Sequence, residues 1–180
     1  MSNRLFDLPE ADPGPLSGYD WIVVNSSGGK DSQAMLDLMC RRAEAEGVLS
    51  RVVVVHCDLG RVEWRGTREI ARAQAAFYGV KWRVVQRALG DLLEHIEARH
   101  ELLVAQGKAD TPAWPSSEAR YCTSDHKRAQ VHKLFTDLVT QTRLDRGQGH
   151  YKKPGEAQVR ILNCLGMRAE ESPKRSKMLA

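Results

Sequence analysis

The chain has 180 residues, a formal net charge of +4 and 42% hydrophobic residues. This length predicts one domain, and the hydrophobic content excludes a disordered polar chain. No apolar run is long enough to cross a membrane, and no basic segment followed by an apolar one opens the chain. We therefore expect a cytoplasmic protein with no membrane partner. The mild positive charge suits a polyanionic ligand, and ordinary surface charge explains it equally well.

Apolar runs alternate with amphipathic stretches along most of the chain. The apolar runs predict strands at 21–25, 51–57, 80–85 and 159–165, and the amphipathic stretches predict helices at 31–46, 67–78, 89–105 and 123–139. This alternation predicts an α/β fold, in which a doubly wound, mostly parallel sheet carries helices on both faces. Residues 1–18 are expected to form an irregular lead-in, residues 19–175 the α/β domain and residues 176–180 a basic tail.

The spacing of apolar residues also predicts which side of each helix faces the core. The inward-facing residues expected for the first two helices are Ala34, Met35, Leu38, Met39, Ile70, Ala73 and Phe77. Loops are expected at 107–121, which is rich in proline, serine and tryptophan, and at 140–155, which is polar and contains glycine.

A glycine-rich turn joins the first predicted strand to the first predicted helix. Its residues are Ser27, Gly28, Gly29, Lys30, Asp31 and Ser32. Glycines let backbone N–H groups approach an anion, the helix start adds a partial positive charge, and Lys30 adds a full one. The two serine hydroxyls are further donors. The spacing differs from that of a Walker A loop. The turn predicts a nucleotide or pyrophosphate site, and a glycine turn without a ligand is the alternative.

Polar residues also follow two other predicted strands, at the sheet edge where ligands of parallel sheets bind. Asp58 follows the second strand and could accept a hydrogen bond from a ribose or adenine, or hold the water of a metal ion. The alternative is that Asp58 caps the next turn. Gly166 and Arg168 follow the last strand, where the planar guanidinium of Arg168 suits a phosphate.

Three motifs occur in a fixed order along the chain. They are the loop Ser27–Ser32, the pattern R-x-C-x-x-x-x-K at Arg120, Cys122 and Lys127, and G-x-R-A-x-E-S at 166–172. In this order they resemble the phosphoadenosine phosphosulfate (PAPS) reductase-like proteins. That family belongs to the pyrophosphate-loop ATP pyrophosphatases of the adenine nucleotide α-hydrolase superfamily. The resemblance covers residues 20–175, so it implies that superfamily's fold for the nucleotide-binding α/β domain.

The resemblance implies that ATP lies across the carboxyl edge of the sheet, with its adenosine near Asp58. Lys30, Asp31 and Arg168 are then the expected catalytic residues, because both cations can stabilise charge on the phosphates. Asp31 and Asp58 are expected to hold Mg²⁺, which prefers carboxylate and phosphate oxygens. The nucleotide contacts expected in addition are Ser27, Gly28, Gly29, Ser32, Arg120, Lys127 and Gly166.

The cysteines decide between the activities of this family. The chain has neither a C-terminal catalytic cysteine nor the Cys-Cys and C-x-x-C patterns of its iron–sulfur members, so no iron–sulfur cluster is expected. Cys40 is expected to be a buried structural thiol. The expected activity is that of an ATP pyrophosphatase or adenylyltransferase, which activates a substrate for sulfur transfer, as in DNA phosphorothioation.

Two alternatives stay open. One is a sulfonucleotide reductase, and the other is a non-catalytic nucleotide-binding subunit of a DNA-modification or defence complex. Besides ATP, nucleic acid, other sulfur-transfer proteins and further copies of the chain in a homo-oligomer are the expected partners. The chemistry needs no histidine, and His56 and His126 are expected to be surface or capping residues.

Overall fold

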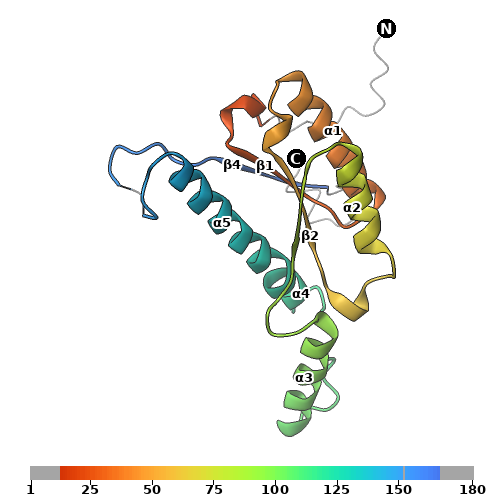
Figure 1. Cartoon of the computed structure of the whole chain (residues 1–180). Helices are drawn as coiled ribbons and strands as arrows, with labels where there is room; N and C mark the ends of the chain where they lie inside the picture. The colour runs from red at the N-terminus through yellow and green to blue at the C-terminus, as the bar shows by residue number, and fades with distance from the viewer. Residues whose placement is uncertain (1–12, 152, 167–180) are drawn as a thin grey trace.

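The computed structural model of the chain describes residues 13–151 and 153–166. Four strands form one all-parallel sheet in the order β3-β2-β1-β4 (Figure 1). They are β1 (Trp21–Asn25), β2 (Val52–Cys57), β3 (Lys81–Val85) and β4 (Ile161–Leu165). In the central strand β1, Ile22 lies opposite Val52 on one side and Leu162 on the other. The predicted strands and their parallel arrangement are therefore confirmed.

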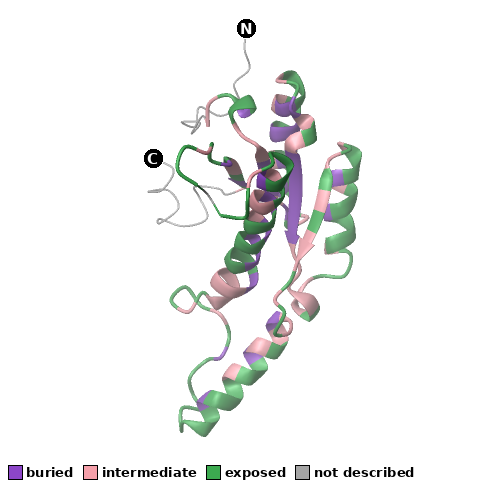
Figure 2. Ribbon diagram, turned by 60° about the vertical axis from the view of Figure 1, so that its left-hand side comes forward, coloured by how far each residue is buried: buried purple, intermediate pink, exposed green. Residues whose placement is uncertain are grey.

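Helices cover both faces of this sheet, which confirms the doubly wound α/β fold. On one face, α1 (Lys30–Ala45) and α2 (Thr67–Phe77) pack on a core that contains Val52 and Val54 of β2. On the other face, α5 (Ala129–Asp145) packs on Val23 and Val55. Figure 2 shows the central strands buried between these layers. Leu16, within a short 3-10 turn (Leu16–Gly18), is fully buried in the first core, so the packed body begins inside the predicted lead-in.

The inward faces predicted for α1 and α2 were wrong in part. Ala34 and Leu38 of α1 are exposed, and its core residues are Leu36, Met39, Cys40 and Ala43. On α2, Ile70, Ala73 and Phe77 are exposed, whereas Ala71 and Ala75 are fully buried. Ala75 packs in the core with Val52 and Val54 of β2, and the larger apolar residues of α2 remain outside.

Helix α3 (Leu92–Ala105) lies beyond the sheet rather than on it (Figure 1). It shares a separate small core with the loop that follows it. The helix starts three residues later than the predicted Leu89, which is exposed. The cause is a capping box, in which the Asp91 carboxylate accepts the Glu94 N–H and the Glu94 carboxylate accepts the Asp91 N–H.

The last helical stretch contains α4 (Tyr121–Thr123), a π turn at Ser124–Arg128 and then α5. It continues to Asp145, so the prediction of a loop from residue 140 was wrong for 140–145. Polar side chains find partners there, because Thr142 accepts a hydrogen bond from Trp21 Nε1 at 2.7 Å and Arg143 pairs with Glu156 at 2.7 Å. Across 13–151 and 153–166, no helix combines the length and apolar character needed to cross a membrane.

Candidate functional site

The predicted glycine loop lies between β1 and α1, at the carboxyl edge of the sheet. Gly28 has φ of +74°, and a Cβ there would lie 3.0 Å from the carbonyl oxygen of Thr67 at the start of α2. Glycine is therefore required at Gly28 both by its backbone conformation and by the close approach of α2. The predicted strand–turn–helix geometry of the loop is confirmed.

Hydrogen bonds within the loop fix its shape. Ser32 Oγ donates to the Gly29 carbonyl at 2.8 Å and accepts the Ser27 N–H at 3.2 Å. The Gly28 N–H donates to Ser26 Oγ at 3.2 Å. In this conformation Ser32 therefore uses its hydroxyl hydrogen within the loop, and its contact with a phosphate stays a prediction.

The start of α1 is suited to an anion. Its N-cap residue is Gly29, and no side chain caps the helix. Lys30, the first residue of the helix, is exposed. The first-turn N–H groups of a helix have no acceptor within the helix, and here no N-cap side chain supplies one. Helix α3, by contrast, satisfies its own start through the carboxylates of Asp91 and Glu94.

The exit of β4 lies against this helix start. A Cβ on Gly166 would be 2.7 Å from the carbonyl oxygen of Asp31 and 3.0 Å from the Ser32 nitrogen. The structure therefore brings Gly166 and the loop together, as predicted, and the absence of a side chain at Gly166 permits the contact. Arg168, with the rest of its motif, lies outside the described residues, so its role stays a prediction.

Asp58 follows β2 and caps the next turn. Its Oδ1 accepts the Gly60 N–H at 2.8 Å, and its Oδ2 lies 3.4 Å from Arg68 Nη1. The capping interpretation of Asp58 is thus confirmed, and its contact with a nucleotide or metal ion stays a prediction. Asp31 is half-buried in the first turn of α1, and its role in holding a metal ion also stays a prediction.

The segment that contains Arg120 and Lys127 reaches the same edge of the sheet at one point. The carbonyl oxygen of Lys127 lies 3.9 Å from Cys57 Sγ, at the end of β2. Lys127 is exposed, and its charge opposes the effect of burial on the pKa of Cys57. Arg120 is also exposed, as the N-cap residue of α4. The backbone at Lys127 therefore reaches the end of β2, and the contacts of Lys127 and Arg120 with a nucleotide stay predictions.

The four cysteines are distributed over three apolar clusters of the structure. Cys40 and Cys164 belong to the core under α1, Cys57 lies on the opposite face of the sheet, and Cys122 packs beside α3. Burial raises the pKa of Cys40, Cys57 and Cys164 to about 11, which keeps these thiols protonated at neutral pH. The prediction of a buried Cys40 is confirmed.

Two histidines that were expected at the surface are buried in the structure. His56 is 1% exposed and His126 is 0% exposed, so the prediction that they are surface or capping residues was wrong. His56 is hydrogen-bonded to the Ser26 carbonyl and the Glu63 carboxylate, and His126 faces His95. The one local signal was the position of His56 in a valine-rich strand. His56 comes two residues after the buried Val54, so the two side chains lie on the same face of the sheet.

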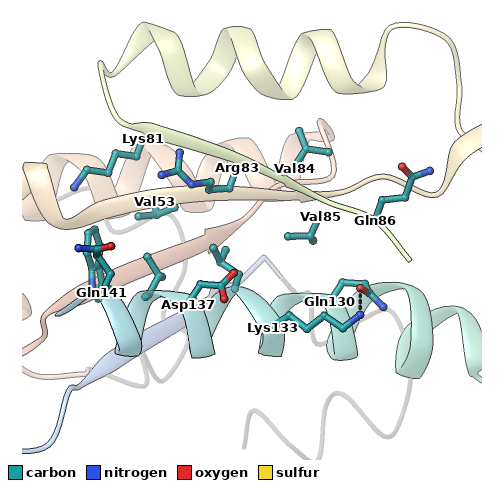
Figure 3. A pocket seen from close by; sticks show the side chains of 13 residues that line it. Val53, Lys81, Arg83, Val84, Val85, Gln86, Gln130, Lys133, Asp137 and Gln141 are labelled. Atoms are coloured by element: carbon teal, nitrogen blue, oxygen red, sulfur yellow. Dashed lines mark hydrogen bonds between the residues drawn. The ribbon is translucent and has the colours of Figure 1, made fainter. Parts of the chain in front are cut away.

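A hollow of about 510 Å³ lies on the other face of the sheet, between α5 and strands β2 and β3 (Figure 3). Its floor includes Val53 and Val85, and Lys81, Arg83 and Lys133 lie around it. It occupies the part of this face that α5 leaves uncovered. The loop residues do not line this hollow, so it is separate from the predicted nucleotide site.

No family model, curated protein or solved structure matches the chain. The functional argument therefore rests on the loop, the strand exits and the motifs themselves.

Proposed function

We propose that the chain is an ATP pyrophosphatase of the PAPS reductase-like family, which transfers AMP to a substrate and so activates it for sulfur transfer. The uncapped glycine start of α1 carries the proposal. At this helix start Lys30 is exposed, and the backbone of Asp31 and Ser32 lies close to Gly166 at the exit of β4. A helix start of this kind suits the phosphates of a nucleotide. DNA phosphorothioation is the proposed setting, with nucleic acid or a sulfur-transfer protein as partner.

The proposed reaction is a displacement at the α-phosphorus of ATP. An oxygen of the substrate forms a bond to this phosphorus. The bond between the α-phosphorus and the oxygen that bridges to the β-phosphorus breaks, and pyrophosphate leaves into the loop. Lys30 and the N–H groups at the start of α1 stabilise the charge on pyrophosphate, and Arg168 stabilises the phosphate from the side of β4. Bound Mg²⁺ would neutralise phosphate charge, and Asp31 and Asp58 are the residues proposed to hold it.

The substitution Lys30→Ala tests this proposal. A charge-assisted hydrogen bond contributes about 1.5–3 kcal/mol, so ATP should bind roughly ten- to a hundredfold more weakly. Calorimetric titration with ATP and Mg²⁺ measures the affinity, and a pyrophosphate assay measures cleavage. Lys108→Ala, which changes an exposed lysine in the loop after α3, is the matched control.

Equal ATP affinity of the folded Lys30→Ala variant and the control would refute the loop assignment. Tight ATP binding without release of pyrophosphate, in the presence of DNA or other candidate acceptors, would instead favour a nucleotide-binding subunit that does not catalyse the reaction.

A further inference from the structure

The hollow between β3 and α5 is elongated (Figure 3). Its α5 wall runs from Gln130 to Gln141, which is about 16 Å, because a helix rises about 1.5 Å per residue. Its β3 wall runs from Lys81 to Gln86, which is also about 16 Å at about 3.3 Å per residue of a strand. The hollow therefore has the length of an extended segment of about five residues.

Strand β3 forms an edge of the sheet, since β2 is its one neighbour among the residues that the structure describes. In a parallel ladder, alternate residues direct their backbone groups towards the neighbouring strand. The Val85 carbonyl accepts the Asp58 N–H on the β2 side, so the backbone groups of Trp82 and Val84 face the open edge. The Trp82 carbonyl accepts Arg83 Nη1 there at 3.1 Å. An open edge is a template for a further strand.

The side chains of β3 alternate between two environments. Lys81 and Arg83 line the hollow, whereas Trp82 packs against the core on the opposite face of the sheet. Figure 3 shows Val85 pointing towards α5 and Val84 pointing away from it. A strand paired with this edge therefore meets positive charge on one face and apolar side chains on the other.

The positive charges around the hollow are not neutralised. Lys81, Arg83 and Lys133 form no salt bridge within the described part of the chain. Asp137 is the one acidic residue in the described lining. Burial lowers the pKa of Lys81, and the positive charge of Arg83 lowers it further. The two cations thus repel each other, and an anionic partner would relieve this repulsion.

Two other occupants fit this surface less well. A second copy of the chain would bring its own Lys81 and Arg83 to the shared edge, where like charges repel. The bases of a nucleic acid bind by stacking on aromatic rings, and in the hollow Lys81 Nζ already covers the Trp21 ring at 4.3 Å from its centroid. An acidic polypeptide, by contrast, matches both the cations and the open backbone groups of β3.

We propose that the β3 edge binds an extended acidic segment of a partner protein, which adds to the sheet beside β3. Its acidic side chains lie in the hollow near Lys81, Arg83 and Lys133, and the apolar residues that alternate with them pack beside Trp82 and Val84. Main-chain hydrogen bonds supply affinity, and the alternating side chains supply specificity. The surface is separate from the phosphate loop, so this inference does not depend on the proposed function.

Fluorescence anisotropy with labelled peptides of about eight residues, long enough to span the β3 edge, tests this proposal. The probe alternates glutamate and valine, and the control peptide alternates lysine and valine. Two further probes carry backbone N-methyl groups, one on every glutamate and the other on every valine. Alternate N–H groups of a strand point to the same side, so we expect one methylated probe to bind like the parent and the other about tenfold more weakly.

The double substitution Arg83→Glu/Lys133→Glu reverses two charges at the hollow. We expect it to weaken binding of the glutamate peptide about ten- to a hundredfold and to strengthen binding of the lysine peptide. The matched control is Arg65→Glu/Arg72→Glu, which reverses two exposed charges before and on α2, the helix on the opposite face of the sheet. Circular dichroism confirms that both variants are folded.

Failure of wild type to bind the glutamate peptide, or equal affinity for the glutamate and lysine peptides, would overturn the proposal even if a variant does not fold. Equal affinity for the two methylated probes would overturn the strand pairing. Equal peptide affinity in the two folded variants would show that the peptide binds elsewhere. If Arg83→Glu/Lys133→Glu lost binding of a thymidine oligonucleotide and not of the peptide, the hollow would be a nucleic-acid site instead.

Discussion

His56 and His126 are both fully enclosed, yet their partners are opposite in kind. His56 has an acceptor at each nitrogen, one of them the Glu63 carboxylate. His126 Nε2 lies 3.0 Å from His95 Nδ1, and its Nδ1 has no hydrogen-bond partner among the residues that the structure describes. One histidine therefore contacts an oxygen at each ring nitrogen, and the other shares a single hydrogen with a second imidazole.

The charge state of the His95–His126 pair follows from its surroundings. Burial lowers the pKa of both His126 and His95, and the positive charge of Arg87 lowers both further. Both shifts favour the neutral form of the His95–His126 pair.

The largest expected effect is that of His56→Leu. This substitution keeps most of the side-chain volume but removes two hydrogen bonds and leaves the Glu63 carboxylate, whose side chain is 18% exposed, without its histidine partner. We expect the free energy of unfolding to fall by about 2–4 kcal/mol. Urea denaturation followed by circular dichroism measures this change. His150→Leu, at an exposed loop position, is the control, and an equal loss in both variants would contradict a bonded His56.

The pH dependence of stability should separate the two histidine sites. Because the folded pKa values of His95 and His126 are lowered, unfolding takes up protons as the pH falls through the unfolded value of about 6.5. Their contribution is fully present above that value and is lost below it. We expect the free energy of unfolding to fall between about pH 7 and about pH 5. The ionisable and charged groups around the pair are Arg87, Asp91, Arg99, Tyr121 and Asp125.

The double variant His95→Leu/His126→Leu tests this assignment. The urea midpoint of this variant should vary less with pH than that of wild type over the same range. All other groups titrate in both proteins, so the difference between the two pH profiles isolates the contribution of the histidine pair. Parallel pH profiles for the two proteins would show that the pair does not titrate in this range.

The sequence predicted well those features that depend on neighbouring residues. The valines of β2 predict a buried central strand, and Gly28 and Gly29 before Lys30 predict a turn into a helix. Both arise from backbone propensity and local spacing. The position of Gly166 against the loop also follows, since parallel strands end at one edge of the sheet.

The features that were missed depend on residues far apart in the chain. His56 is buried because Ser26, thirty residues earlier, and Glu63 both bond to it. On α2, the ranking of Ile70 and Phe77 as core residues was wrong, because the buried side of the helix carries Ala71 and Ala75. Hydrophobicity along one helix contains no information about how closely that helix approaches its neighbour.

The smallest expected effect is that of His126→Leu alone, and it completes the comparison with His56→Leu. The substitution removes the hydrogen bond to His95, which costs about 1 kcal/mol, and also removes a buried nitrogen without a partner, whose burial is itself unfavourable. His95 is partly exposed, so its free nitrogen can bind water. We therefore expect a change of at most about 1 kcal/mol in the free energy of unfolding, measured by the same urea denaturation at about pH 7.5 where the pair is neutral. A loss as large as that of His56→Leu would show that His126 has a strong partner at its Nδ1, and the contrast between the two buried histidines would then be wrong.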